Sequence, residues 1–223
     1  MDNKLMDTLK VLYNAFDKLN ERYFNGELIQ PIITIQKTKG SVMGHFSVGK
    51  VWKDKHNVEE EDLAMHEINL DPRYFLRDTV DIIGTLLHEM VHYYNNVCGI
   101  KDCSGQNHNK KFKAAAERVD LIVEKGDSVG WGYTNVSDDL RMFIENEIKP
   151  DDTVFDYFRW ELPEDKSKKK RKKNIFKFTC PECGMEVKSK KGNIIKCGNC
   201  DIVLIMENED EDESEEDFEN GEN

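Results

Sequence analysis

The first 26 residues combine apolar and polar positions with a helical period. The apolar positions follow one another at spacings of three and four: Leu5, Leu9, Leu12, Phe16, Leu19 and Tyr23. Such spacing places them on one face of a helix, and the pair Asn25-Gly26 is a typical helix stop. The segment therefore predicts an amphipathic helix whose apolar face packs against the rest of a domain.

Three short apolar segments follow, each bounded by turn residues or charges. They cover residues 32–35, 42–48 and 64–70 and have partly alternating patterns. Short alternating segments of this kind predict strands of one sheet. Helical spacing then returns between Asp78, which has the position of an N-cap, and Gly99.

A last periodic segment predicts a helix from about Lys110 to Glu124. Its apolar face would hold Phe112, Ala115, Ala116, Val119 and Ile122. Residues 127–162 show no clear period, but they contain too much aromatic surface for a disordered segment, so we assign them to the same domain. Helices with a small sheet make this an α+β domain.

Charge divides the rest of the chain. The 223 residues carry a net charge of -12, but residues 1–165 carry -10, residues 166–206 carry +9 and residues 207–223 carry -11. Residues 166–173 hold seven Lys or Arg in eight positions, which marks a domain boundary. We predict a domain at residues 1–165, a basic linker at 166–178, a small module at 179–206 and a disordered acidic tail at 207–223.

Hydropathy and cysteine usage indicate the compartment. No apolar run approaches the roughly 18 residues that a membrane span needs, and the N-terminus lacks a signal-peptide pattern. We expect a soluble, intracellular monomer without membrane contact, cytoplasmic or, in a eukaryote, nuclear. Four of the six cysteines form two C-x2-C pairs, which inside a cell favours metal ligation over disulfides.

The central predicted helix contains the segment His88-Glu89-Met90-Val91-His92. Two histidines four residues apart project from one helix face and can bind one zinc ion, with Glu89 beside the open coordination position. Zinc acidifies a bound water and the glutamate moves its proton, which is the chemistry of a zincin-type protease. A chance match is disfavoured because the helix is amphipathic and follows strands.

A catalytic zinc usually needs a third protein ligand. Glu117 lies on the following predicted helix, and His108 lies just before it. The metzincin pattern would require Gly and His where Asn95 and Cys98 stand, so that class is disfavoured. Spacing alone leaves both His108 and Glu117 open.

Several further segments carry a family resemblance that covers nearly everything before the acidic tail. They are Tyr23-Phe24-Asn25-Gly26-Glu27-Leu28, Gly44-His45-Phe46, Glu67-Ile68-Asn69-Leu70, Leu86 to His92, and His108 ahead of Phe112. With them the chain resembles the SprT-like (Spartan-like) zinc metalloproteases, a family that includes a protease acting on proteins crosslinked to DNA. The resemblance implies that His108 is the third ligand and Glu89 the general base. Asn109 departs from the family, which often has Gly there.

The second metal motif lies near the C-terminus. Cys180, Cys183, Cys197 and Cys200 form two pairs with 13 residues between them. This is the spacing of a zinc ribbon, in which four thiolates close a tetrahedral shell around a structural zinc ion. The other two cysteines, Cys98 and Cys103, are expected to be reduced thiols.

The basic linker provides candidate contacts to nucleic acid: Lys168, Lys169, Lys170, Arg171, Lys172 and Lys173. Together with the ribbon they predict DNA binding through phosphates, whereas the alternative is a solvated basic linker.

These observations predict an endopeptidase with one catalytic and one structural zinc ion, acting on DNA-associated or DNA-crosslinked proteins. The rival interpretation is a non-catalytic nucleic-acid-binding protein whose protease domain is degenerate. Retention of Glu89 and of all three histidines disfavours that rival.

Overall fold

The computed structural model describes residues 4–56, 58–59, 63–160 and 175–206. The chain divides into two compact units, Met1–Leu162 and Pro163–Asn223, which are described separately. The basic stretch at 166–173 and the acidic tail at 207–223 lie outside the described residues. None of the helices in the described part is both long enough and apolar enough to cross a membrane.

The first unit is built around one buried helix, α2 (Thr79–Val97). Six of its apolar side chains are at most 1% exposed: Ile82, Ile83, Leu86, Leu87, Met90 and Val91. A helix that is apolar on most sides is stable only inside a core, where each such side chain contributes about 1.5–3 kcal/mol. Asp78 caps the helix as predicted, because its side chain accepts a hydrogen bond from the backbone N–H of Val80. The backbone of α2 is therefore held in place, and so are the starting points of its side chains.

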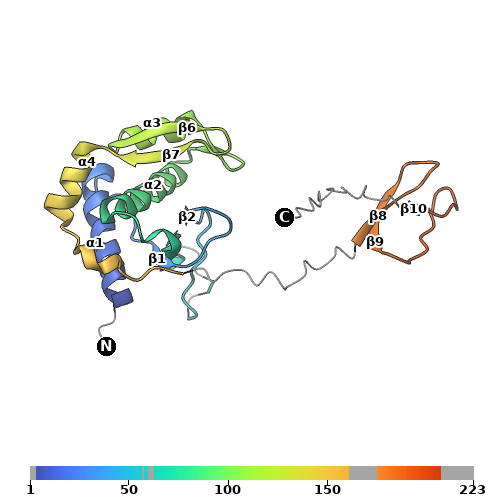
Figure 1. Cartoon of the computed structure of the whole chain (residues 1–223), viewed down its shortest axis with the longest axis horizontal. Helices are drawn as coiled ribbons and strands as arrows, with labels where there is room; N and C mark the ends of the chain where they lie inside the picture. Colours follow the sequence, from blue (N-terminus) through green and yellow to red (C-terminus); the bar gives the residue numbers. More distant parts are fainter. Residues whose placement is uncertain (1–3, 57, 60–62, 161–174, 207–223) are drawn as a thin grey trace, which may run out of the picture. The chain divides into compact units, whose positions relative to one another are not determined.

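Helix α1 (Lys4–Phe24) and a small sheet pack against α2 (Figure 1). On the predicted apolar face of α1, Leu12, Phe16 and Leu19 are inaccessible to solvent, whereas Leu5 at the start of the helix is 52% exposed. The sheet contains β1 (Ile32–Ile35), β2 (Gly44–Phe46) and β3 (Glu67–Leu70) in the order β1-β3-β2. Strand β1 is parallel to β3 and β2 is antiparallel to it, so β2 is an edge strand.

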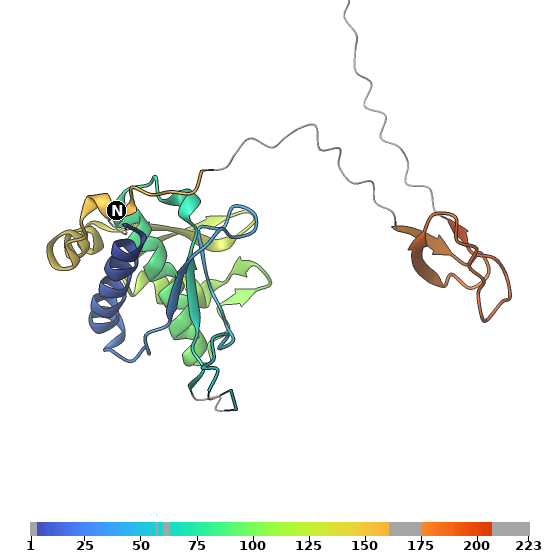
Figure 2. The same cartoon turned by 90° about the horizontal axis from the view of Figure 1, so that it is seen from below.

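A second sheet lies on the other side of α2. It has the order β4-β5-β7-β6 and consists of β4 (Cys103–Ser104), β5 (Asn107–His108), β7 (Gly130–Val136) and β6 (Leu121–Gly126). Helix α3 (Lys110–Glu117) packs on β6 and α2. Figure 1 shows α2 between the β6–β7 hairpin and the sheet of β1 and β2, and Figure 2 shows the same layers from below.

The predicted helix from Lys110 to Glu124 is wrong in its second half. Helix α3 ends at Glu117, and Asp120 has a φ of 61°, a left-handed conformation that stops the helix. The following segment is rich in β-branched residues and forms β6 instead. Ile122, predicted to be buried, is 49% exposed because the side chains of β6 alternate between core and solvent. The first-sheet strands predicted at 42–48 and 64–70 are also shorter than expected.

Residues 130–155 complete the core, although their sequence pattern is weak. After β7 come α4 (Asp138–Phe143), a π-helical turn (Ile144–Ile148) and a 3-10 turn, η4 (Asp152–Phe155). Their apolar side chains, including Leu140 and Ile144, join the same core cluster as α1 and α2. This architecture confirms the predicted α+β class.

The second unit contains a small antiparallel sheet. Its strands are β8 (Ile175–Thr179), β9 (Glu186–Lys190) and β10 (Ile205–Met206), in the order β10-β8-β9. Phe178 and Leu204 are buried against Cys180 and Cys197 in a core of only a few residues. So small a core cannot hold a fold alone, and a metal ion would supply the missing stability.

A buried ion pair ties the loop after β1 to the end of β3. Asp71 is fully buried, and its carboxylate lies 2.7 Å from Nη2 of Arg73 and 2.6 Å from the backbone nitrogen of Thr38. Arg73 also donates to the carbonyl oxygen of Gly40 at 2.8 Å. Burial alone would raise the pKa of Asp71, but hydrogen bonds from Arg73 and Thr38 hold it well below its usual range. The pair therefore fixes the loop at residues 38–43.

Asp71→Asn should lower the free energy of unfolding by about 3 kcal/mol at pH 7, because it leaves the charge of Arg73 without its partner. The folded-state pKa of Asp71 is depressed. Its stabilisation is thus present above the unfolded pKa of about 3.9 and is lost as the pH falls below it. Urea unfolding at pH 7 and pH 3, with exposed Asp139→Asn as the control, measures both effects. If the wild type exceeded the Asp71→Asn variant in free energy of unfolding by as much at pH 3 as at pH 7, this role of Asp71 would be contradicted.

Candidate metal centre

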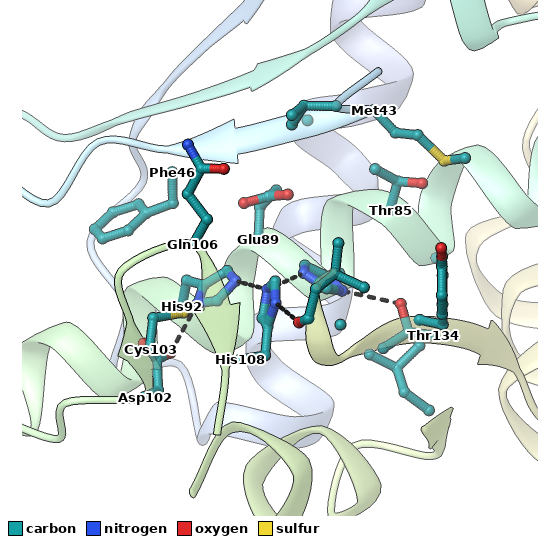
Figure 3. A pocket seen from close by; sticks show the side chains of 18 of the residues that line it. Met43, Phe46, Thr85, Glu89, His92, Asp102, Cys103, Gln106, His108 and Thr134 are labelled. Atoms are coloured by element: carbon teal, nitrogen blue, oxygen red, sulfur yellow. Dashed lines mark hydrogen bonds and ion pairs between the residues drawn. The ribbon is translucent and has the colours of Figure 1, made fainter. Parts of the chain in front are cut away.

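Three histidines from two elements point their Nε2 atoms at one spot. His88 and His92 lie on successive turns of α2, and His108 ends β5. The Nε2 atom of His108 lies 3.2 Å from that of His88 and 3.0 Å from that of His92 (Figure 3). Three nitrogens bound tetrahedrally to zinc at 2.0–2.1 Å are about 3.3 Å apart. The spacing therefore fits one metal ion.

The other ring nitrogen of two of these histidines donates a hydrogen bond. Nδ1 of His92 donates to the Asp102 carboxylate at 2.7 Å, and Nδ1 of His108 donates to the carbonyl oxygen of Val129 at 3.0 Å. Carboxylate and carbonyl oxygens only accept, so both Nδ1 atoms carry the proton. Each Nε2 atom then presents a lone pair, as metal ligation requires.

His88 completes the set. Its Nδ1 atom lies 2.9 Å from the hydroxyl oxygen of Thr134 on β7, which can accept a hydrogen bond from it. Burial lowers the pKa of both His88 and His108, which keeps these rings neutral. Burial would also lower the pKa of His92, but its hydrogen bond to Asp102 and the nearby charges of Glu89 and Asp102 raise it instead, so a metal ion bound here would displace a proton from this ring. The histidine group can therefore hold a metal ion, and its all-nitrogen donor set suits zinc.

The position of His108 depends on close approach by β7. A Cβ atom on Gly132 would lie 2.4 Å from Nδ1 of His108, and one on Gly130 would lie 2.3 Å from its carbonyl oxygen. Below the histidines, the buried Phe112 ring has its centroid 4.5–4.7 Å from all three imidazole rings. Asn109, the departure from the family pattern, caps α3 with an extended backbone, so no glycine is needed there.

Glu89 lies beside the histidines and faces β2 (Figure 3). Its side chain accepts a hydrogen bond from the backbone N–H of Phe46, and a Cβ atom on Gly44 would lie 3.2 Å from its Oε1 atom. Glu89 is only 5% exposed, and burial raises its pKa to about 7. A nearby cation would lower that pKa again. The carboxylate and the three histidines line one cleft of about 1580 Å³.

Glu117 does not join the site. It lies at the end of α3 with its side chain 49% exposed, 3.5 Å from the amine of Lys113. Of the two open candidates for the third ligand, the structure brings His108 to the histidine pair.

A second group of potential ligands adjoins the first. It consists of His92, Asp102 and Cys103. Burial raises the pKa of the Cys103 thiol to about 12, so this sulfur is a poor thiolate ligand. Cys98 and Cys103 are both free, as expected.

In the second unit the predicted ribbon cysteines come together. The sulfur atoms of Cys180, Cys183, Cys197 and Cys200 all lie within 4.8 Å of one another. Both pairs have the same turn: the N–H of Gly184 donates to the Cys180 carbonyl and that of Asp201 to the Cys197 carbonyl, each at 2.9 Å. Gly184 and Asp201 both have positive φ. The cluster can hold a metal ion and fits a ribbon.

The family model of the SprT-like family matches residues 12–129, just over half of the chain, and this span contains Glu89 and all three histidines. The chain belongs to the SprT-like family. No curated protein and no solved structure matched it. Membership supports a metalloprotease-like domain, and the SprT-like match ends before the ribbon begins.

Sequence reasoning missed the residues that hold the histidines. Asp102 and Thr134 act through contacts between distant parts of the chain, which no local spacing predicts. The spacing did predict that Phe112 is buried, but not that its ring packs against the three histidines. The Gly130-Trp131-Gly132 segment was the one available signal, because two glycines in a strand often mark a close backbone approach.

His108→Ala should remove one bound metal ion per chain, whereas Glu117→Ala should leave the metal content unchanged. The reason is that losing one of three protein ligands weakens metal binding sharply, while Glu117 points away from the site. Elemental analysis of the purified full chain measures the stoichiometry. Loss of metal from the Glu117 variant alone would assign the third ligand to the glutamate.

Proposed function

We propose that the SprT-like domain is a zinc-dependent endopeptidase. The observation that supports this most is the presence of three converging Nε2 atoms and the carboxylate of Glu89 in one cleft. A structural zinc site closes its coordination shell with four protein ligands, whereas a catalytic one keeps a position open. Three histidines leave that position open, and the cleft gives a substrate access to it.

Each side chain has a defined task in this proposal. A zinc ion held by His88, His92 and His108 would acidify a water molecule and polarise the scissile carbonyl group. Glu89 accepts the proton of the attacking water and delivers it to the amide nitrogen that leaves. Asp102 keeps the proton of His92 on Nδ1 and so preserves its ligating lone pair.

Strand β2 is suited to bind a polypeptide. It lies at the edge of its sheet and pairs only with β3 among the strands described. Gly44 and Phe46 of β2 line the cleft beside Glu89. An extended peptide could add to this edge through main-chain hydrogen bonds, which are independent of sequence. Its amide bond would then lie next to the reacting groups.

We further propose that the substrates are DNA-associated or DNA-crosslinked proteins, brought to the domain by the basic segment and the ribbon. On the ribbon, Lys177 of β8 lies directly opposite Lys188 of β9, and Lys190 is exposed on the same side of β9. Like charges directly opposite each other are destabilising in a sheet, so a bound phosphate would relieve the repulsion between these lysines. Glu186 already forms an ion pair with one of them, at 2.6 Å from Lys177.

Glu89→Gln should retain two metal ions and its fold but lose about 10²- to 10⁴-fold in turnover, because a positioned base contributes on that scale. Cleavage of a defined DNA–protein crosslink and of an unstructured protein measures the loss. Metal content and melting temperature serve as the structural controls. Near-wild-type proteolysis by this variant would overturn the mechanism, and a metal-loaded wild type without any proteolysis would favour the non-catalytic DNA-binding alternative.

Replacing Lys169, Lys170 and Arg171 by Ala should reduce the slope of log affinity against log salt by roughly two to three for duplex DNA, since each lost phosphate contact removes about 0.9. Alanine at Lys10, Lys55 and Lys125, which are exposed on the first unit, is the control with the same charge change. Fluorescence anisotropy at several salt concentrations gives the slope. An unchanged slope in the first variant would show that the basic segment is a solvated linker.

A further inference from the structure

An arginine lines the same cleft one helical turn away from Glu89. Arg77 precedes α2, and its Nη2 atom donates to the hydroxyl oxygen of Thr85 at 2.7 Å. Thr85 lies four residues before Glu89, which is about 6 Å along the helix. Figure 3 shows Thr85 and Glu89 on the same side of α2, with Met43 opposite.

The guanidinium group of Arg77 is held in place by two hydrogen bonds and still has unused N–H donors. Its Nε atom donates to the carbonyl oxygen of Tyr74 at 3.3 Å, and the Thr85 hydroxyl that it contacts donates in turn to the carbonyl oxygen of Asp81. A guanidinium group has five N–H donors, so three remain after these two bonds. Arg77 is therefore oriented before any ligand arrives.

The charge of Arg77 has no close counter-ion. Among the described residues it forms no ion pair, and Asp81 is the acidic group that acts on it from a distance. Asp81 itself lies 3.9 Å from Arg141. The Arg77 side chain is half-buried, and this burial lowers its pKa. Lys39, on the loop fixed by Asp71, adds a second positive charge to the cleft lining.

We propose that Arg77 forms a subsite for an acidic side chain of the polypeptide substrate, an assignment that rests on the proposed peptidase function. A carboxylate at this point would take the unused donors of the guanidinium group in a charge-assisted pair. An extended peptide advances about 3.3 Å per residue, so the acidic residue lies roughly two or three positions from the bond that is cleaved.

The geometry favours a peptide carboxylate over a nucleic-acid phosphate. The guanidinium group is only partly exposed and lies within the cleft that also contains Glu89 and the edge of β2. A peptide that pairs with β2 passes this point, whereas the first unit as a whole carries a negative charge that repels a polyanion.

The test uses the full chain and a peptide mixture randomised at three positions on each side of the cleaved bond. Sequencing of the products should show Asp and Glu enriched about 10-fold over Asn and Gln at one position, as expected for a hydrogen-bonded charge pair. Arg77→Gln should abolish the enrichment, Arg77→Lys should retain part of it, and Arg77→Glu should shift it to Lys and Arg. Arg118→Glu, an exposed charge reversal outside the cleft lining, should leave it unchanged.

A binding measurement separates this proposal from the proposed function. Anisotropy of labelled acidic and amide peptides with the Glu89→Gln chain needs no turnover, and it should show the same Arg77-dependent preference. Cleavage of all peptides without acidic preference would overturn the subsite and leave the peptidase intact. Absence of cleavage together with Arg77-dependent binding would retain the subsite and reject the peptidase. If Arg77 variants changed the affinity for a single-stranded oligonucleotide but not for the peptides, the site would bind phosphate and the proposal would be wrong.

Discussion

Three imidazole lone pairs that converge on one point form the constraint on which the site depends. Their Nδ1 atoms face acceptors on three different segments, and Nε2 of His108 lies within 3.2 Å of both other Nε2 atoms. A positive ion bound among these nitrogens, either a metal ion or a proton, would relieve the repulsion between their lone pairs. The buried helix α2 supplies the rigidity, because its packing on both sheets prevents the histidines from moving apart.

In the proposed function the same helix connects metal binding to substrate binding. Successive turns of α2 present Thr85, Glu89 and His92 to one cleft. The residue that holds Arg77, the proposed base and one metal ligand therefore lie along the same helix. The opposite wall is the β2 edge and the loop that Asp71 and Arg73 fix. Under the proposed function, a peptide bound between these walls would be aligned with Glu89 and the histidines by elements that are already ordered, which would reduce the entropy lost on binding.

The features predictable from the sequence are those with a local period or spacing. The helices at α1 and α2, the Asp78 cap, the histidine pair and the four ribbon cysteines all follow from residues a few positions apart. The failures have a common cause. The β6 strand replaced the end of a predicted helix because a left-handed Asp120 and tertiary pairing with β7 outweighed a helical pattern. The choice of His108 over Glu117 and the roles of Asp102 and Thr134 depend on contacts across the fold, which spacing does not encode.

Anomalous diffraction at the zinc absorption edge from crystals of the zinc-loaded full chain would locate the ions that the three histidines and the four cysteines hold. We expect one peak about 2.0–2.1 Å from Nε2 of His88, His92 and His108, and a second about 2.3 Å from the four ribbon sulfur atoms. The adjacent group of His92, Asp102 and Cys103 is the alternative binding site for the first ion. A peak at that group, or no peak beside the three Nε2 atoms, would contradict the proposed catalytic centre.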